Sequence, residues 1–323
     1  MTRAFVLGGT GLLGFETIKE LLKRGYKVST IARNKEMMDE LIPEEVEKHI
    51  GDINEMTDEQ IGAMLQSTDW FVHAAGVDER TTPEAPAVSF YYRENVLPTQ
   101  RLSRIAREAG VRKFVIYGSY HVEFAEKWPD LGLKRTPYVR TRKLQEEVAM
   151  LEGEGEMDVM SLRLPYIFGT MPGRMPLWKM FLPTVLGKEI ITVPEGATAM
   201  VTTRQVAEAG VGALEHGSHG GTYAISGENM SYAEFYRIIA DTAGQKDSVI
   251  QTASLEQLLP TFEQIDKQTA EAGKERAMPG IKTAELQSRN TIIDPAETME
   301  LLKYKKDDVQ AAIEESIRKS LAE

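Results

Sequence analysis

A glycine run near the start of the chain constrains the fold most: Gly8-Gly9-Thr10-Gly11-Leu12-Leu13-Gly14. It follows a short apolar stretch, residues 4–7, that is typical of a buried strand. It precedes residues 16–23, whose apolar side chains recur at helical spacing. Glycines at such a strand-to-helix turn let the backbone approach a pyrophosphate, and the free N–H groups of the first helical turn face its charge. The run therefore predicts a dinucleotide site.

The same alternation of short apolar runs and amphipathic stretches continues through the first half of the chain. We expect strands at about 28–31, 49–50, 70–73, 113–117 and 159–162, with helices at about 57–66, 93–109 and 138–151. Strands that alternate with helices pair in parallel through right-handed crossovers. The pattern therefore predicts an α/β class with a doubly wound parallel sheet, a Rossmann fold.

The regular alternation ends after Pro165. Prolines and glycines crowd residues 165–194, with Met, Trp and Phe side chains between them, which indicates a lobe or lid. A strand is expected at 222–225 and helices at about 231–244 and 307–321, whereas residues 254–290 are polar and weakly periodic. We predict a dinucleotide-binding domain over 1–165 with a returning segment over about 198–227. A smaller C-terminal substrate lobe would comprise 166–197 and 228–323.

Composition excludes several classes of function. A formal net charge of −11 leaves no broad basic face for nucleic acid or an anionic membrane. The sequence contains no cysteine, which rules out disulfides, thiolate metal sites and thiol catalysis. Its five histidines are scattered and form no metal site, and no apolar run approaches the ~20 residues of a membrane span. We expect a soluble, cytoplasmic protein whose partner is a small-molecule substrate.

The end of the second expected strand indicates which dinucleotide binds. Chains that use NAD place a carboxylate there, about 20 positions after the glycines, to hold the ribose 2′-hydroxyl. Here the strand ends Thr30-Ile31-Ala32-Arg33-Asn34, and a guanidinium suits a 2′-phosphate. We therefore predict NADP rather than NAD; the alternative is that Arg33 is a solvated surface cation. Asp52 would accept from the adenine amino group or stabilise a turn.

Further fragments resemble the extended short-chain dehydrogenase/reductase family, of the NAD-dependent epimerase/dehydratase-like kind, over nearly the whole chain. They are the glycine run, Gly51-Asp52-Ile53, His73-Ala74-Ala75-Gly76, Glu94-Asn95-Val96, Gly118-Ser119-Tyr120-His121-Val122, Pro137-Tyr138, Leu162-Arg163-Leu164-Pro165-Tyr166-Ile167-Phe168-Gly169 and Gly221-Thr222-Tyr223-Ala224-Ile225-Ser226-Gly227. Each fragment alone is loose, but their order and spacing are specific. Relatives often pair as dimers through two long helices, here about 93–109 and 138–151, and the sequence leaves the oligomeric state open.

The resemblance implies a role for each matching position. Cofactor contacts would come from Gly8, Thr10, Gly11, Leu12 and Gly14 (pyrophosphate), Arg33 (2′-phosphate), Asp52 and Ile53 (adenine), Ala74, Ala75 and Gly76 (ribose), Asn95 (catalytic floor), and Pro165, Tyr166 and Ile167 (nicotinamide carboxamide). Ser119 would hydrogen-bond the substrate oxygen, and Tyr138 would be the acid/base.

The sequence departs from the family at the catalytic helix. The tyrosine is normally followed four residues later by lysine, but here that position is Arg142 and lysine comes at 143. Residues four apart share a helix face, whereas Lys143 would be turned roughly 100° away. Arg142 supplies the cation that a tyrosine needs to exchange a proton near neutrality, although it cannot itself release a proton. We expect Arg142 to hold the ribose and bias Tyr138; the alternative is a surface cation beside a packing tyrosine.

Substrate groups are expected at the carboxyl ends of the strands, and Tyr120, His121, Arg174 and Trp178 are the candidates. The hypothesis is an NADP-dependent oxidoreductase that transfers a hydride between nicotinamide and a carbonyl or alcohol, with Ser119, Tyr138 and Arg142 as catalytic groups. The alternatives are a nucleotide-sugar epimerase or dehydratase and a non-catalytic NADP-binding sensor. The sequence does not identify the substrate.

Overall fold

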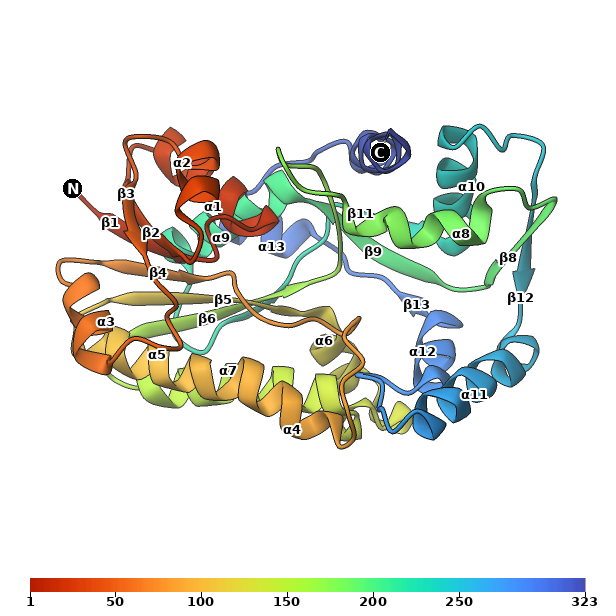
Figure 1. The fold of residues 1–323 in the computed structure, drawn as a ribbon, viewed down its shortest axis with the longest axis horizontal. Coiled ribbons are helices and arrows are strands. Elements are labelled where there is room, and N and C mark those ends of the chain that lie inside the picture. Colours follow the sequence, from red (N-terminus) through yellow and green to blue (C-terminus); the bar gives the residue numbers. More distant parts are fainter. Residues whose placement is uncertain (323) are drawn as a thin grey trace.

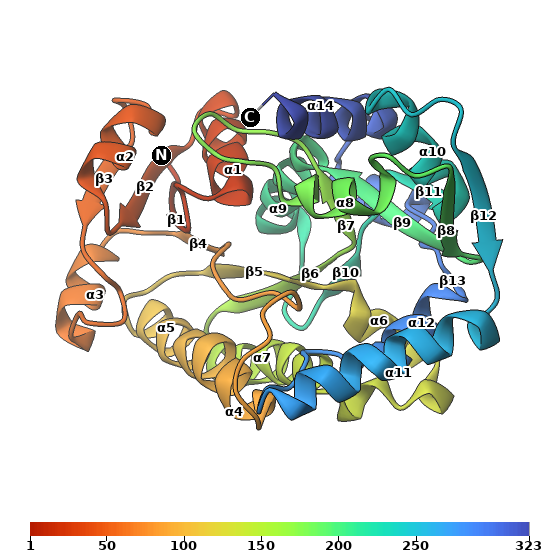
Figure 2. The same cartoon turned by 45° about the vertical axis from the view of Figure 1, so that its right-hand side comes forward.

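The computed structural model describes residues 1–322. Its central sheet has seven parallel strands in the order β10-β6-β5-β4-β1-β2-β3 (Figure 1; β10 is labelled in Figure 2). They are β1 (Arg3–Leu7), β2 (Lys27–Ala32), β3 (Glu47–Ile50), β4 (Trp70–His73), β5 (Lys113–Ser119), β6 (Asp158–Leu164) and β10 (Thr222–Ala224). The predicted parallel Rossmann fold is confirmed. The strand order reverses between β1 and β4, which is where such sheets bind their ligands.

Helices cover both faces of this sheet because alternate strand residues point to opposite sides. In β1, Ala4 and Val6 join a core with Ile18 of one helix layer, while Phe5 and Leu7 join a second core. The first layer holds α1 (Leu12–Lys23), α2 (Lys35–Leu41) and α9 (Thr203–His216), and the second holds α3 (Asp58–Met64), α5 (Leu97–Glu108) and α7 (Pro137–Gly153) (Figure 1).

The structure differs from the sequence expectations at one helix and adds elements that were not predicted. The helix expected at 93–109 is preceded by α4 (Ala87–Tyr91) and interrupted by a π-helical turn at Tyr92–Val96 before α5. The chain passes from β5 straight into α6 (Tyr120–Lys127) with no loop. The weakly periodic stretch contains two helices, α11 (Leu255–Glu271) and α12 (Gly280–Gln287). Helix α11 does carry apolar residues at helical spacing (Leu255, Leu258, Leu259, Phe262 and Ile265), but these side chains are only half-buried.

The smaller lobe has its own sheets and lies beside the carboxyl ends of the large sheet (Figure 2). Its strands are β7 (Tyr166–Phe168), β8 (Ile190–Pro194), β9 (Ala197–Thr202), β11 (Glu228–Ser231), β12 (Val249–Ala253) and β13 (Asn290–Thr291), and its helices include α8 (Leu182–Val185), α10 (Tyr232–Thr242) and α14 (Val309–Leu321). A short helix, α13 (Ala296–Leu302), packs on α9. Within the expected returning segment, α9 packs on α1 and β10 joins the large sheet, whereas β9 lies in the lobe. The domain division stays a prediction.

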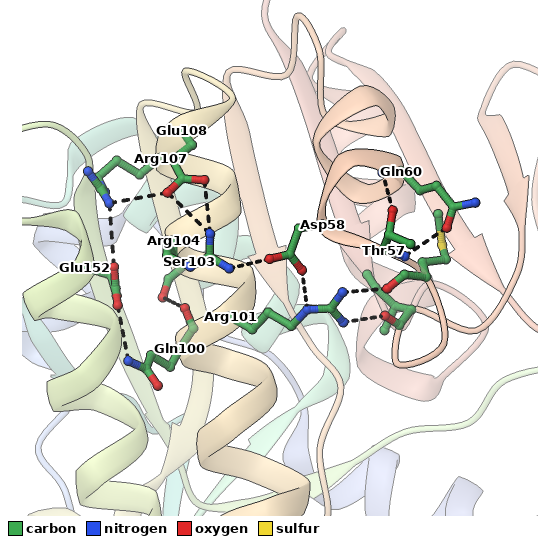
Figure 3. Close-up of polar contacts among 12 residues, drawn as sticks. Thr57, Asp58, Gln60, Gln100, Arg101, Ser103, Arg104, Arg107, Glu108 and Glu152 are labelled. Atoms are coloured by element: carbon green, nitrogen blue, oxygen red, sulfur yellow. Dashed lines mark hydrogen bonds and ion pairs between the residues drawn. The ribbon is translucent and has the colours of Figure 1, made fainter.

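Charged contacts tie α3 to α5 (Figure 3). Asp58 at the start of α3 accepts from Arg101 Nε at 2.7 Å and from Arg104 Nη2 at 2.5 Å. Arg101 also donates to the carbonyl of Ile53 at 3.2 Å and that of Met56 at 2.5 Å. These bonds fix the loop after β3, where the adenine side of the cofactor site was predicted.

None of the helices within residues 1–322 is long and apolar enough to span a membrane.

An ion cluster between β6, α6 and α7 has a buried centre and two partly exposed carboxylates. The side chain of Arg163 is 2% exposed and pairs with Glu146, which is 1% exposed, at 3.0 Å. Glu123 and Glu126 approach the same guanidinium at 2.7 and 2.8 Å. Carboxylates on three sides neutralise the buried cation, as a charge in such a position requires.

Replacing Arg163 with methionine would leave Glu146 buried without its cation. We expect Arg163→Met to lower the free energy of unfolding by about 3–5 kcal/mol, measured by urea denaturation. The matched control is Arg112→Met, which removes an exposed pair with Asp69 at 2.8 Å and should cost under about 1 kcal/mol. Similar losses in both variants would contradict the assigned role of the cluster.

Candidate active site

The glycine turn has the geometry that a pyrophosphate needs. Gly8 adopts a φ of +91°, a left-handed conformation that glycine tolerates. Helix α1 begins at Leu12, and no side chain caps its N-terminus at Gly11. A Cβ atom on Gly14 would lie 2.1 Å from the Gly8 carbonyl oxygen, so α1 packs against the turn as only glycine permits. The open N–H groups at this helix start fit an anionic group, and the turn therefore fits a dinucleotide.

A cavity of about 290 Å³ extends from this turn across the carboxyl ends of the strands. One end is formed by Gly11, Leu12 and Leu13, and its floor by residues 74–76, which follow β4. Tyr138 and Arg142 of α7 line its far part. The cavity thus joins the predicted phosphate site to the predicted catalytic residues in one space.

The predicted cofactor residues divide into two groups. Those that line the cavity are Gly11, Leu12, Ala74, Ala75, Gly76, Arg142, Pro165, Tyr166 and Ile167. The others, Gly8, Thr10, Gly14, Arg33, Asp52, Ile53 and Asn95, do not line it. The backbone of Gly8 and Gly14 forms the turn. Asn95 contacts the loop after β4 instead: its side-chain amide accepts from the Val77 N–H at 2.8 Å and donates to the Val77 carbonyl at 2.9 Å. Asn95 therefore holds the loop after β4 in place.

The residues predicted to meet adenosine lie at the ends of β2 and β3. Arg33 is 81% exposed, and its Nη1 lies 3.7 Å from the Asp52 carboxylate. Asp52 also accepts from the backbone N–H of Asn54 at 3.0 Å, which is a turn contact. The Arg33 guanidinium is therefore accessible to an anion at the edge of the sheet, with one carboxylate beside it.

The catalytic candidates of α7 are brought together as the helical spacing predicts. Tyr138 is 2% exposed, and Arg142 Nε donates to its hydroxyl oxygen at 3.1 Å. The guanidinium carbon of Arg142 lies 5.3 Å from the centre of the Tyr138 ring. Lys143 points elsewhere, and its Nζ pairs with Glu126 at 2.9 Å. The cation beside the tyrosine is therefore Arg142, and Lys143 belongs to the surroundings of the ion cluster.

Burial controls the protonation of Tyr138. It raises the pKa of this hydroxyl to about 12, against the opposing effect of Arg142, and Glu79 adds to the rise. At neutral pH the hydroxyl keeps its proton and has one to donate. A cofactor or substrate that brings further positive charge would lower this pKa toward the working range.

Ser119 ends β5 and caps α6, so its hydroxyl is fixed beside His121. Ser119 Oγ lies 3.2 Å from His121 Nδ1 and accepts from the His121 backbone N–H at 3.3 Å. The His121 ring centre is 6.1 Å from that of Tyr138. Burial lowers the pKa of His121, so the ring is neutral at pH 7 and serves as a hydrogen-bond partner of Ser119.

The predicted substrate residues all line the cavity, but they do different things. The Tyr120 hydroxyl oxygen lies 3.1 Å from Thr198 Oγ1. Trp178 stacks between Phe168 and Phe181, with ring centres 4.4 and 5.6 Å away. Together with Leu177, Met180 and Phe181, Trp178 forms an apolar cover over the cavity, on a segment that we call the lid (residues 170–181).

Arg174 lies at the cofactor end of the lid. Its Nη1 is 3.6 Å from the position that a Cβ atom on Gly11 would occupy. No carboxylate within residues 1–322 pairs with it. The structure thus places Arg174 beside the glycine turn, although the sequence suggested a substrate contact.

Sequence reasoning missed two sets of residues. Asp78, Glu79 and Arg80 line the cavity after β4, and Arg80 Nε donates to Asp78 at 2.9 Å. Three consecutive charged residues that begin two positions after Gly76 could have been noticed as a signal. Thr99 and Gln145, buried behind Arg142, carry no such signal, because single polar residues on long helices usually face solvent.

Comparison with known proteins identifies the family of the chain. A family model described as the NAD dependent epimerase/dehydratase family matches residues 4–226. The chain is 25% identical over 255 residues to sterol demethylase protein B of Methylococcus capsulatus, covering 74% of each protein. It is 25% identical over 177 residues to the human sterol-4-alpha-carboxylate 3-dehydrogenase, decarboxylating, covering 52% of this chain and 45% of that protein.

The fold is shared with solved structures of lower identity. The crystal structure of UDP-glucuronic acid 4-epimerase from Bacillus cereus in complex with NAD superposes with a TM-score of 0.70 at 16% identity, over 99% of each chain. With a family model matched over residues 4–226, the chain belongs to the NAD dependent epimerase/dehydratase family and is of the extended short-chain dehydrogenase/reductase type.

Proposed function

We propose that this protein is an NADP-dependent oxidoreductase that acts on the carbonyl or alcohol group of a small, largely apolar molecule. The observation that carries the proposal is the contact between Arg142 Nε and the Tyr138 hydroxyl at 3.1 Å. This pair faces the same cavity as the glycine turn. A cation held on a buried tyrosine is the arrangement that proton exchange with a substrate oxygen requires.

The residues of this chain divide the work as follows. NADPH, when bound along the glycine turn and residues 74–76, supplies the hydride for reduction. Ser119 Oγ donates a hydrogen bond to the substrate oxygen and fixes its position. Tyr138 transfers its hydroxyl proton to that oxygen as negative charge develops there, and takes a proton back in the oxidative direction. Arg142 remains charged throughout and stabilises the phenolate that forms on Tyr138 when its proton is transferred.

The cations of the cavity favour an apolar substrate over a nucleotide sugar. Among its described lining residues, three are arginines: Arg80, Arg142 and Arg174. Arg80 is paired with Asp78, Arg142 contacts Tyr138, and Arg174 lies at the glycine turn. No further arginine or lysine lines the cavity to receive the diphosphate of a nucleotide sugar. The lid instead presents Leu177, Trp178 and neighbouring apolar groups, which suit a hydrocarbon or ring surface.

Turnover tests the reaction. With NADPH and a panel of apolar aldehydes and ketones, we expect Tyr138→Phe to lower kcat at least a hundredfold, measured by loss of nicotinamide absorbance, because the proton donor is removed. The control is Tyr92→Phe, an exposed tyrosine outside the cavity, which should keep full activity. Tight NADPH binding without turnover would favour a sensor, and interconversion of nucleotide sugars without net change in cofactor would favour an epimerase.

Cofactor preference depends on Arg33. We expect Arg33→Ala to weaken NADP binding by roughly tenfold to a hundredfold, the value of one or two charge-assisted hydrogen bonds. NAD binding should change little, because NAD lacks the 2′-phosphate. Isothermal titration with both cofactors measures this, and Arg93→Ala, another exposed arginine, serves as control. A preference for NADP that survives in Arg33→Ala would contradict the assignment.

Arg174 is proposed to bind the pyrophosphate across the glycine turn. Arg174→Gln should raise the Kd for NADP about tenfold, since one charge-assisted contact is lost. It should leave binding of adenosine 2′-monophosphate unchanged, because that ligand carries the 2′-phosphate but no phosphate at the 5′ position, where the pyrophosphate begins. Lys179→Gln, on the same lid segment, is the matched control. Equal weakening of both ligands by Arg174→Gln would point to a general loss of the lid rather than to a pyrophosphate contact.

A further inference from the structure

We infer that Gln145 and Thr99 are positioning residues that hold Arg142 in the one orientation in which an arginine can take the place of the family's lysine. The inference rests on the proposed oxidoreductase function, and it concerns side chains outside the cavity. Neither residue touches the reacting atoms, so both would act through Arg142.

An uninterrupted line of hydrogen bonds connects Tyr138 to α5. Arg142 Nε donates to the Tyr138 hydroxyl at 3.1 Å, and Arg142 Nη1 donates to Gln145 Oε1 at 2.8 Å. Gln145 Nε2 donates to Thr99 Oγ1 at 2.8 Å. Thr99 Oγ1 donates to the backbone carbonyl of Asn95 at 2.7 Å, which anchors the line in the main chain.

Burial makes this line a constraint on geometry. Arg142 is 7% exposed, Gln145 is 1% exposed and Thr99 is fully buried. Water therefore has little access to replace any of the bonds, and a broken bond leaves a polar group unsatisfied. The side-chain amide of Gln145 uses both its acceptor and a donor, so its own orientation is determined as well.

We call Gln145 and Thr99 the brace of Arg142. The chemistry explains why an arginine at this position needs such positioning residues and a lysine does not. An ammonium group is a compact charge that acts alike from any direction, whereas a guanidinium is a planar fork with its N–H groups at fixed angles. With Nε on Tyr138 and Nη1 on Gln145, the Arg142 plane is fixed. The end of the guanidinium then lies beside Gly76, with Nη1 and Nη2 3.6 and 3.9 Å from the position that a Cβ atom there would occupy. That is the side on which the nicotinamide ribose is expected.

His73 is a buried histidine that contacts Thr99 and adds no positive charge beside Arg142. His73 Nε2 is 3.1 Å from Thr99 Oγ1, and burial together with Arg142 lowers the pKa of His73 to about 4. The ring is therefore neutral at working pH, and Arg142 is the charged group on that side. The other titratable groups that face Tyr138 are His121 of α6, Tyr91 of α4, and Glu79 and Arg80 of the loop after β4.

The test compares variants of the brace in the alcohol-oxidation direction with NADP. Oxidation requires ionised Tyr138, so its rate rises with pH through the pKa of that hydroxyl. Thr99→Val keeps the volume but removes the hydroxyl that Gln145 needs, and Gln145→Met removes the contact with Arg142. We expect each to move the pH midpoint of kcat upward by about one unit and to lower kcat at neutral pH about tenfold. The KM for NADP should stay within threefold.

Thr99→Ser is the conservative variant, because it keeps the hydroxyl, and it should restore both the midpoint and kcat. Thermal unfolding is followed in parallel. Thr99→Val and Gln145→Met variants that melt earlier but keep the wild-type midpoint would overturn the proposal, since the brace would then be purely structural. So would a Thr99→Ser variant that behaves like Thr99→Val.

A spectroscopic measurement separates this inference from the proposed function. The tyrosinate absorbance of the protein with NADP bound, minus that of Tyr138→Phe, reports the titration of Tyr138 without any turnover. We expect its midpoint to rise in Thr99→Val and Gln145→Met and to stay in place in Thr99→Ser. If Tyr138→Phe retains full activity, the proposed function fails, but this titration still decides whether the brace sets the pKa of Tyr138. A midpoint unchanged in Thr99→Val and Gln145→Met overturns the inference.

Discussion

The close approach of helix α1 to the turn before it sets the position of every other part of the site. The Gly8 carbonyl oxygen would lie 2.1 Å from a Cβ atom on Gly14. A Cβ atom on Gly9 would lie 2.3 Å from Thr30 Oγ1 of β2, and one on Gly8 would lie 3.1 Å from the Ala74 carbonyl after β4. Three neighbouring strands therefore meet at one turn with no space for side chains. This packing brings the phosphate end of the cavity and the loop after β4 within reach of one ligand.

Two buried arginines show how the protein treats positive charge in different ways. Arg163 is surrounded by three carboxylates, which neutralise it and make it a structural group. Arg142 has no carboxylate within 4 Å among residues 1–322; its side-chain contacts are Tyr138 and Gln145, both uncharged at neutral pH. Its field therefore remains available to a developing phenolate. The cost of keeping such a charge buried is offset by hydrogen bonds alone, which is why their number and direction matter here.

Sequence reasoning was most successful where spacing carries the information. The glycine run, the β2 end at Arg33 and the four-residue step from Tyr138 to Arg142 follow from periodicities of strand and helix, and the parallel sheet follows from their alternation. It failed where the structure depends on contacts between distant segments. The partnership of Thr99 with Gln145 joins residues on two helices 46 positions apart, and nothing local marks either one.

The same limit applies to α11 and to Arg174. The apolar residues of α11 recur at helical spacing from Leu255 to Ile265, but Pro260 and many polar residues interrupt them, and none of the side chains is fully buried. Arg174 stands in an irregular segment, and its place beside Gly11 depends on how that segment folds back over the turn. Sequence spacing therefore predicts which residues line the cavity, but it does not predict the direction in which loop side chains point.

The lid connects the two ends of the site in a way that the order of the sequence hides. It carries Arg174 at the glycine turn and Trp178 over the far part of the cavity. Trp178 Nε1 donates to the Ile167 carbonyl at 2.6 Å, and Thr170 Oγ1 donates to Glu315 of α14 at 2.5 Å. The C-terminal helix thus supports a segment that lines both ends of the cavity, although the helix lines no part of the cavity itself. The apolar wall of the cavity depends on the same short segment that carries Arg174 to the glycine turn, so the shape of the cavity and the position of this cation are coupled through residues 170–181.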